Sequence, residues 1–325
     1  MTKLRARLLL GGVLAVALAA AAIAALDRGA PTWTAKSTMP FNRAEIAVAE
    51  LNGKVYVMTG QSPGVEANAF IQEYDPATGN WRDLSFMPSV ASHAGAAALN
   101  GKIYVVGGFV ANVHIGAVAR VFEYDPANDS WRALAPLSAP RGSPAVVALN
   151  GKIHAIAGRN FEMVMQTTHE VYDPAADRWT MAAPIPEARD HTGVAVLDGK
   201  IHVFGGRSGA TANRLGTHYV YDPAADRWST AAPLNAPRSA GAGFALDGRI
   251  YYAGGECKDP EAGVTFDEVE TYDPAADRWT ALAPMPHGKH AGAAVVLGDE
   301  ALVIGGNTGC GSRMPTNEVL AFSVE

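Results

Sequence analysis

Six tryptophans recur at nearly constant intervals, and this period constrains the fold more than any other feature of the chain. Successive intervals are 48, 50, 48, 49 and 51 residues, counted over Trp33, Trp81, Trp131, Trp179, Trp228 and Trp279. A period near fifty residues has room for about four short strands, and one such sheet buries its faces only by stacking against copies of itself. The chain is therefore predicted to be an all-β array of repeats.

Two further motifs define the strands of each repeat. Five tryptophans follow a Tyr-Asp-Pro turn, and each repeat has an apolar run ending in glycine, at residues 51–60, 99–108, 149–158, 197–206, 246–255 and 297–306. The Asn-Gly or Asp-Gly inside most of these runs favours a tight hairpin, because both turn positions need positive φ. The β-branched and aromatic residues that follow are typical of a strand covered on both faces. The tryptophan is expected to begin the outer strand and to cover the gap to the neighbouring repeat.

The two ends of the repeat array are incomplete in complementary ways. The last copy stops after an expected third strand at residues 317–322, whereas residues 31–33 resemble an outer strand with no strands before it. We predict that these ends complete one blade together and close the ring, which removes both free strand edges. The propeller is expected over 27–325, with blades at about 41–86, 87–136, 137–184, 185–233, 234–284, and 285–325 plus 31–40.

A charged and then apolar segment precedes the repeats. Lys3, Arg5 and Arg7 are followed by nineteen uncharged residues, 8–26. This pattern predicts a hydrophobic helix over 1–26 that acts as a secretory signal peptide or as an uncleaved membrane anchor. Both alternatives place the propeller outside the cytoplasm, in the periplasm or the extracellular space, and only this segment would touch the membrane.

Charge and cysteine content exclude several other classes. The formal net charge is −6, whereas a nucleic-acid-binding protein needs a basic surface, so no nucleic-acid partner is expected. The two cysteines, Cys257 and Cys310, are too few for a disulfide scaffold or a CxxC zinc site. No cofactor is expected, and the histidine spacings contain no metal-ligand motif, so no metal site is predicted.

On its glycine pairs, Tyr-Asp-Pro turns and tryptophans, the chain resembles the kelch-repeat family over nearly all of residues 31–325, in particular the exported bacterial kelch proteins. The resemblance implies a six-bladed β-propeller. Some copies depart from the pattern: the glycine pair is Thr59-Gly60 in the first repeat and Ala157-Gly158 in the third.

One position of the repeat is basic in five of six copies. It lies eight residues before the repeat leucine, in the loop that leads into each innermost strand, and it is occupied by Arg43, Ala91, Arg141, Arg189, Arg238 and Lys289. Such a ring at the channel mouth would attract an anion, and arginine suits carboxylate or phosphate. In cullin-adaptor kelch proteins, arginines at this position receive acidic side chains. The alternative is structural, with each arginine bonded to backbone carbonyl groups of a neighbouring blade.

Four other residues are candidates for a role in the site. His93 and His191, two residues after the basic position, are candidate ligand-binding or acid–base groups, although packing at the start of the strand is the more ordinary role. Cys257 and Cys310 fall in equivalent loops of adjacent blades, so a disulfide between them is predicted for an exported protein.

Two functions are compatible with these residues. The first is a non-catalytic binding module for an acidic small ligand or an acidic loop of a protein partner. The second rests on resemblance to N-acetylneuraminate epimerase, an exported kelch propeller. It would be a sugar-acid mutarotase, with Arg141, Arg189 and Arg238 as anchors and Glu162 or Glu256 as acid–base group. An enzyme should bring carboxylates together with the arginines, whereas a binding module should show an open ring.

Overall fold

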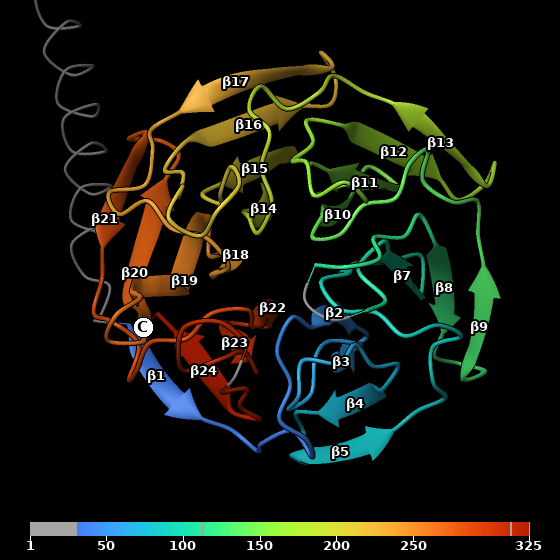
Figure 1. Ribbon diagram of the computed structural model, residues 1–325, viewed down its shortest axis with the longest axis horizontal. Helices are drawn as coiled ribbons and strands as arrows, with labels where there is room; N and C mark the ends of the chain where they lie inside the picture. Colours follow the sequence, from blue (N-terminus) through green and yellow to red (C-terminus); the bar gives the residue numbers. More distant parts are fainter. Residues whose placement is uncertain (1–30, 112–113, 313, 325) are drawn as a thin grey trace, which may run out of the picture.

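The computed structural model describes residues 31–111, 114–312 and 314–324, and every regular element in these ranges is a β-strand. The strands form six antiparallel sheets of four, arranged as blades around a central axis (Figure 1). The predicted signal or anchor segment lies outside the described residues. Within them, no helix has the length and apolar character needed to cross a membrane.

Five blades are built from consecutive strands, which run in chain order from axis to rim. The first contains β2 (Ala47–Leu51), β3 (Lys54–Met58), β4 (Ile71–Asp75) and β5 (Asn80–Asp83). The second contains β6 (Gly95–Leu99), β7 (Lys102–Val106), β8 (Val121–Asp125) and β9 (Ser130–Ala133). The third contains β10 (Ala145–Leu149), β11 (Lys152–Ile156), β12 (His169–Asp173) and β13 (Arg178–Met181). The fourth contains β14 (Gly193–Leu197), β15 (Lys200–Phe204), β16 (His218–Asp222) and β17 (Arg227–Ala231). The fifth contains β18 (Ala242–Leu246), β19 (Arg249–Asp259), β20 (Val264–Asp273) and β21 (Arg278–Ala281).

The sixth sheet joins strands from opposite ends of the sequence. It contains β22 (Ala293–Leu297), β23 (Glu300–Ile304), β24 (Val319–Ser323) and, at the rim, β1 (Thr32–Ala35). Trp33 of β1 lies opposite Phe322 of β24, and the two rings pack edge to face with their centroids 5.0 Å apart. Strands from the two ends of the described chain therefore share one blade.

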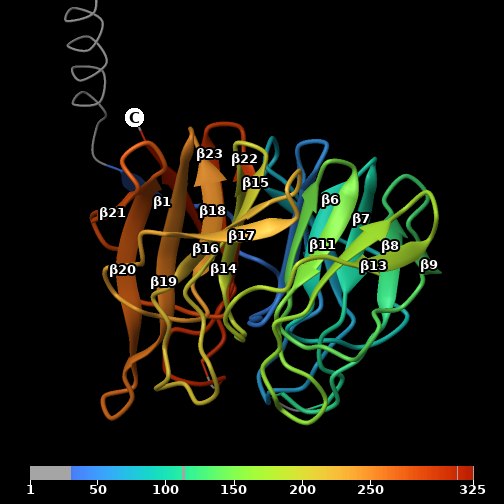
Figure 2. The same cartoon turned by 90° about the horizontal axis from the view of Figure 1, so that it is seen from above.

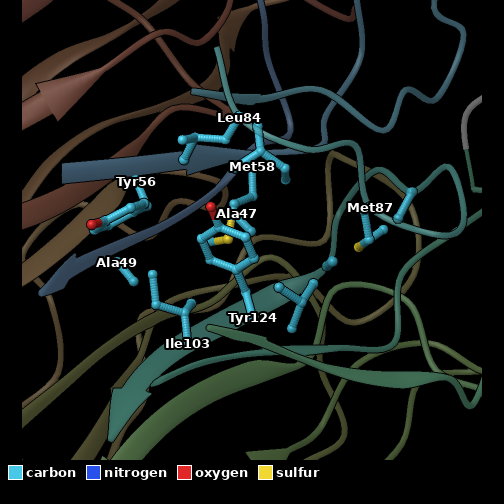
Figure 3. Close-up of a cluster of buried hydrophobic side chains, with 12 residues drawn as sticks. Ala47, Ala49, Tyr56, Met58, Leu84, Met87, Ile103 and Tyr124 are labelled. Carbon is cyan, nitrogen blue, oxygen red and sulfur yellow. The ribbon is translucent and has the colours of Figure 1, made fainter. Parts of the chain in front are cut away.

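The hydrophobic core lies between the blades, because the second strand of each sheet is covered on both faces. In β3, Tyr56 and Met58 pack toward the second blade (Figure 3), whereas Val55 and Val57 pack toward the sixth. All four side chains are at most 4% exposed. Continuous apolar runs in this strand are the expected pattern for a strand that has no solvent face.

The tryptophans and the acidic turns connect each blade to the one before it. The indole N–H of Trp179 donates to the backbone oxygen of Ala135, 2.9 Å away, and four other tryptophans make the same contact with the preceding blade. Asp177 accepts hydrogen bonds from the hydroxyl of Tyr172 and from the backbone N–H of Ala135. The repeated Tyr-Asp-Pro-Trp element therefore joins blades as well as forming a turn.

The tight turns have the backbone conformation that their sequence predicts. Asn52 and Gly53 both have positive φ, as a two-residue hairpin requires. At Gly107, the first of a glycine pair, an added Cβ would lie 2.3 Å from the backbone oxygen of Arg141 in the next blade. Only glycine allows this approach without a shift of one backbone.

Candidate functional site

Two kinds of loop share one face of the propeller, which we call the loop face. These are the loops between the second and third strands of each blade and the connections between blades. Antiparallel bridges join the two kinds, for example Ala44 with Gln61 and Asp190 with Arg207. In Figure 2 the longer loops, including the hairpin between β19 and β20, extend from this face, whereas the ends of the described chain lie toward the other.

A ring of six residues with left-handed backbone surrounds the channel at the loop face. All have φ between 52° and 58°, and they are Glu45, His93, Ser143, His191, Ala240 and Ala291. Backbone hydrogen bonds run around this channel ring, since the N–H of each of five members donates to the oxygen of another, as from His93 to Glu45 at 3.0 Å. Left-handed backbone at residues other than glycine carries strain and is common at functional sites.

The channel ring borders two cavities. The first, of about 130 Å³, is lined by the six ring residues and the residue after each of them. The second, of about 280 Å³, continues along the axis between the innermost strands and is lined mainly by residues with apolar side chains, including Val48, Val146 and Val194. The polar side chains of the channel are thus concentrated at the loop face.

Three histidines from different blades meet at this position. His93 and His191 belong to the channel ring, and His114 reaches it from the loop between β7 and β8. One ring nitrogen from each lies within 4.8 Å of those of the other two, and the Nε2 atoms of His114 and His191 are 3.3 Å apart. The imidazole centroids are 4.8 to 5.2 Å apart with the rings tilted edge to face. We call these residues the histidine cluster.

Buried charges surround the histidine cluster. Asp190 is fully buried and lies 2.9 Å from Nε of Arg159, 3.2 Å from Nε of Arg207 and 3.1 Å from Nδ1 of His191. Arg207 also donates to Glu256 at 2.6 Å, and its Nη2 lies 3.2 Å from Nε2 of both His114 and His191. These ion pairs hold the guanidinium group against the two imidazoles.

The surroundings favour the neutral form of His114 and His191 and the ionised form of Asp190 and Glu45. Burial, together with repulsion from His191 and His93, lowers the pKa of His114 to about 2, and burial and Arg207 also lower the pKa of His191. Burial alone would raise the pKa of Asp190, but His191, Arg207 and Arg159 lower it well below its usual range. The same balance applies to Glu45. Burial alone would raise its pKa, but His93, whose Nε2 lies 3.2 Å from the carboxylate, lowers it well below its usual range.

The structure corrects the prediction of a basic channel mouth. Arg43, Arg141, Arg189, Arg238 and Lys289 are at most 2% exposed and do not line either cavity. Arg141 donates to the backbone oxygens of Ala157 and Thr168 and to Glu170, all in its own blade, and Lys289 donates to Glu318. Burial lowers the pKa of Arg43 to about 10. These side chains are structural, because they are buried and their charged groups bond to neighbouring groups of the fold.

Other predicted site residues are also reassigned. Glu162 is exposed in the loop between β11 and β12, and Glu256 is paired with Arg207. Neither carboxylate meets Arg141, Arg189 or Arg238 in the way the sugar-acid alternative requires. Cys257 and Cys310 are free cysteines that lie in contact, so the disulfide between them stays a prediction. Burial and a contact with Cys310 raise the pKa of Cys257 to about 12.

The histidine cluster was not predicted from the sequence, because its members are far apart in the chain. His114 lies in a loop that differs between repeats and has no motif around it. No sequence pattern indicates that Arg159 and Arg207 both lie next to Asp190, beside His191. Alignment of the repeats contains one indication that two of these histidines lie close together. His93 and His191 share a position in blades two and four, and that position faces the axis in every blade.

Comparison with known protein families identifies the repeats. A family model described as the KLHDC2/KLHL20/DRC7 Kelch-repeats domain matches residues 177–306, and one described as the Kelch motif matches residues 91–138. The chain is a kelch-repeat protein. The predicted family is confirmed, and the matched residues include all strands of blades two, four and five, the outer strand of blade three and the two inner strands of blade six.

Two similar proteins extend the comparison. Kelch-like protein 34 of Homo sapiens is 38% identical to this kelch chain over 61 residues, which are 18% of this chain and 10% of that protein. A solved structure titled "Structure of YjhT" superposes with a TM-score of 0.77 at 17% identity, covering 89% of this chain and 99% of the other. At this identity the likeness shows a shared propeller fold.

Proposed function

We propose that this kelch propeller is a non-catalytic binding module that holds a protein partner on its loop face. The observation that carries the proposal is the distribution of exposed apolar side chains. Of the eleven large hydrophobic side chains exposed among the described residues, ten lie on the loop face, and only Met181 lies on an outer strand. Clustered exposed apolar residues on a folded domain mark interaction sites.

Three phenylalanines form the clearest contact surface. Phe41, Phe70 and Phe86 come from three loops around the first blade and are 47%, 36% and 64% exposed. Phe70 stacks on Phe41 with centroids 5.7 Å apart and meets Phe86 edge to face at 5.6 Å. We call them the aromatic patch. Rigid aromatic side chains are enriched at the centres of protein interfaces, where they contribute much of the binding energy.

A second apolar group lies on the same face. Phe161, Met163 and Val164 occupy one loop between β11 and β12 and are 45% to 70% exposed. Methionine and phenylalanine adapt to apolar partner surfaces. A partner that contacts both groups would span the loop face from the first blade to the third, so the proposed interface is broad.

The buried basic residues remove the reason to prefer an acidic ligand. The two channel cavities, of about 130 and 280 Å³, are also each smaller than the roughly 300–1,000 Å³ typical of ligand pockets. We therefore retain the predicted protein partner, but we propose that it binds through apolar contacts and not through an acidic loop.

Quantitative affinity purification from the native host tests this proposal. The full chain is compared with Phe41→Ser/Phe86→Ser and with Met181→Ser as the matched control away from the loop face. A partner recovered with wild type and control is then purified and titrated calorimetrically. We expect the double variant to weaken its affinity at least tenfold while its melting temperature stays close to that of wild type. Equal affinity of all three proteins would overturn the proposal, as would self-association as the sole interaction detected by light scattering.

A further inference from the structure

We propose that His93, His114 and His191 form a binding site for a divalent transition-metal ion at the loop-face end of the channel, with zinc as the reference ion. Three imidazoles from three loops converge there, whereas the sequence shows no metal-binding motif. This proposal does not depend on the proposed protein partner.

The distances between ring nitrogens fit a shared metal ion. Zinc–nitrogen bonds of about 2.0–2.1 Å in tetrahedral geometry place two ligand nitrogens about 3.4 Å apart. The Nε2 atoms of His114 and His191 are 3.3 Å apart, and one ring nitrogen from each of the three histidines lies within 4.8 Å of those of the other two. Two ligands are therefore in position, and a small movement of one side chain brings the third within bonding distance.

A buried histidine nitrogen faces a carboxylate at the same place. The side chain of His93 is fully buried, and its Nε2 lies 3.2 Å from the carboxylate of Glu45. The Nδ1 atom of His93 lies 3.0 Å from the hydroxyl of Ser92, which leaves Nε2 as its ligand atom. Imidazole nitrogens and carboxylate oxygens are both ligands for zinc, so a metal ion would take the place of the proton between them.

Carboxylates complete the surroundings of a metal ion. The Nδ1 atom of His191 lies 3.1 Å from Asp190, an arrangement that fixes the ring and raises its basicity as a metal ligand. The Glu45 carboxylate, 3.2 Å from Nε2 of His93, is placed to serve as a fourth ligand. Imidazole nitrogens with one carboxylate suit zinc, copper, nickel or iron better than calcium or magnesium.

Arg207 is the competitor for this site. Its Nη2 lies 3.2 Å from the Nε2 atoms of both His114 and His191, so it donates into the space between them. This contact shows that both nitrogens present acceptor lone pairs, the form that binds a metal. Three carboxylates, on Glu45, Asp190 and Glu256, outnumber the two guanidinium groups of Arg159 and Arg207 near the cluster. A bound divalent ion would displace Nη2, and Arg207 would remain paired with Glu256.

Calorimetric titration of the metal-free full chain with zinc tests the site. Wild type should bind one equivalent, and His114→Gln and His191→Gln should each weaken binding at least tenfold. His287→Gln, at an exposed histidine paired with Glu318, is the matched control and should bind as wild type does. Arg207→Gln should bind zinc more tightly, because it removes a competing cation.

A variant without cysteines distinguishes zinc bound by the histidine cluster from zinc bound by cysteine thiols. Cys257→Ser/Cys310→Ser should keep the zinc site, and cobalt added to this variant should give the visible absorption bands of a tetrahedral ion. Absence of stoichiometric binding would overturn the proposal, and so would binding that survives in His114→Gln or disappears in the cysteine variant. His114 is in a loop outside the core, so its variant remains informative if His191→Gln does not fold.

Discussion

At the residue scale, the buried basic ring shows how a repeated residue type can indicate the wrong function. Arg238 is fully buried and donates to Glu270 and to the backbone oxygens of Tyr252 and Ala236. Its guanidinium carbon also lies 4.6 Å from the centre of the Tyr252 ring. The arginine recurs in four blades, and in each of them it donates to backbone oxygens of that blade.

Arg238→Met should lower the free energy of unfolding by about 3–5 kcal/mol, because it leaves Glu270 buried without its cation. Arg238→Met/Glu270→Leu should recover most of that loss, since an apolar pair requires no desolvation of charge. Denaturant unfolding measures both changes, with Arg178→Met, at an exposed arginine, as the control. A loss below 1 kcal/mol in the single variant would contradict the structural role.

The channel ring leads to a second prediction at this scale. Ala291 has a φ of 58°, and left-handed backbone costs a side-chain-bearing residue about 1–2 kcal/mol. Ala291→Gly should therefore raise the free energy of unfolding by about 0.5–1 kcal/mol after the added flexibility of glycine is counted. Ala293→Gly in β22, where the backbone is extended, should lower it by a similar amount. A loss of stability in Ala291→Gly would show that the left-handed backbone is not strained.

At the element scale, blades three and four differ from the others by pairs of buried histidines. Nδ1 of His154 in β11 lies 2.9 Å from Nε2 of His169 in β12, and His202 and His218 form the same contact in β15 and β16 at 3.0 Å. Burial lowers the pKa of His202 to about 4 and that of His218 to about 3, with repulsion from His202 adding to the shift of His218. These imidazoles are neutral in the folded protein.

The pairs should make the protein sensitive to mild acid. In the unfolded chain these histidines titrate near pH 6.5. Because the unfolded state takes up protons first as pH falls, the stability is fully present above about pH 6.5 and is lost progressively toward the folded pKa values. His202→Leu/His218→Val copies Leu302 and Val319, which hold the same register in the sixth blade. Calorimetric melting between pH 7 and 4.5 should fall less steeply in this variant, and an unchanged slope would refute the assignment.

The strands were predictable because their signals are local. Asn52-Gly53 requires a tight turn, Tyr172 and Asp177 form their bond within five residues, and each tryptophan reaches one neighbouring blade. The histidine cluster is different, because His114 and His191 belong to separate blades and meet only when the ring is assembled. Side chains that converge on an axis from distant repeats leave no spacing pattern in the sequence.

At the scale of the whole molecule, β1 is expected to hold the ring closed by pairing with β24. A chain beginning at residue 37 lacks this strand, whereas a chain beginning at residue 31 keeps it. The shorter chain should lose at least about 3 kcal/mol of unfolding free energy, the scale of one packed aromatic side chain, and should associate through the exposed edge of β24. Denaturant unfolding and light scattering compare the two chains. Equal stability and a monomeric state for both would contradict closure by β1.

The central claim is that binding occurs on the loop face, where exposed apolar side chains surround the histidine cluster. Site-specific photo-crosslinking tests it most directly, with the crosslinking residue placed at position 161 on the loop face or at Asn150, an exposed turn on the opposite face. We predict that position 161 captures one dominant partner and that position 150 does not. Capture of that partner from position 150, with none from position 161, would contradict the claim.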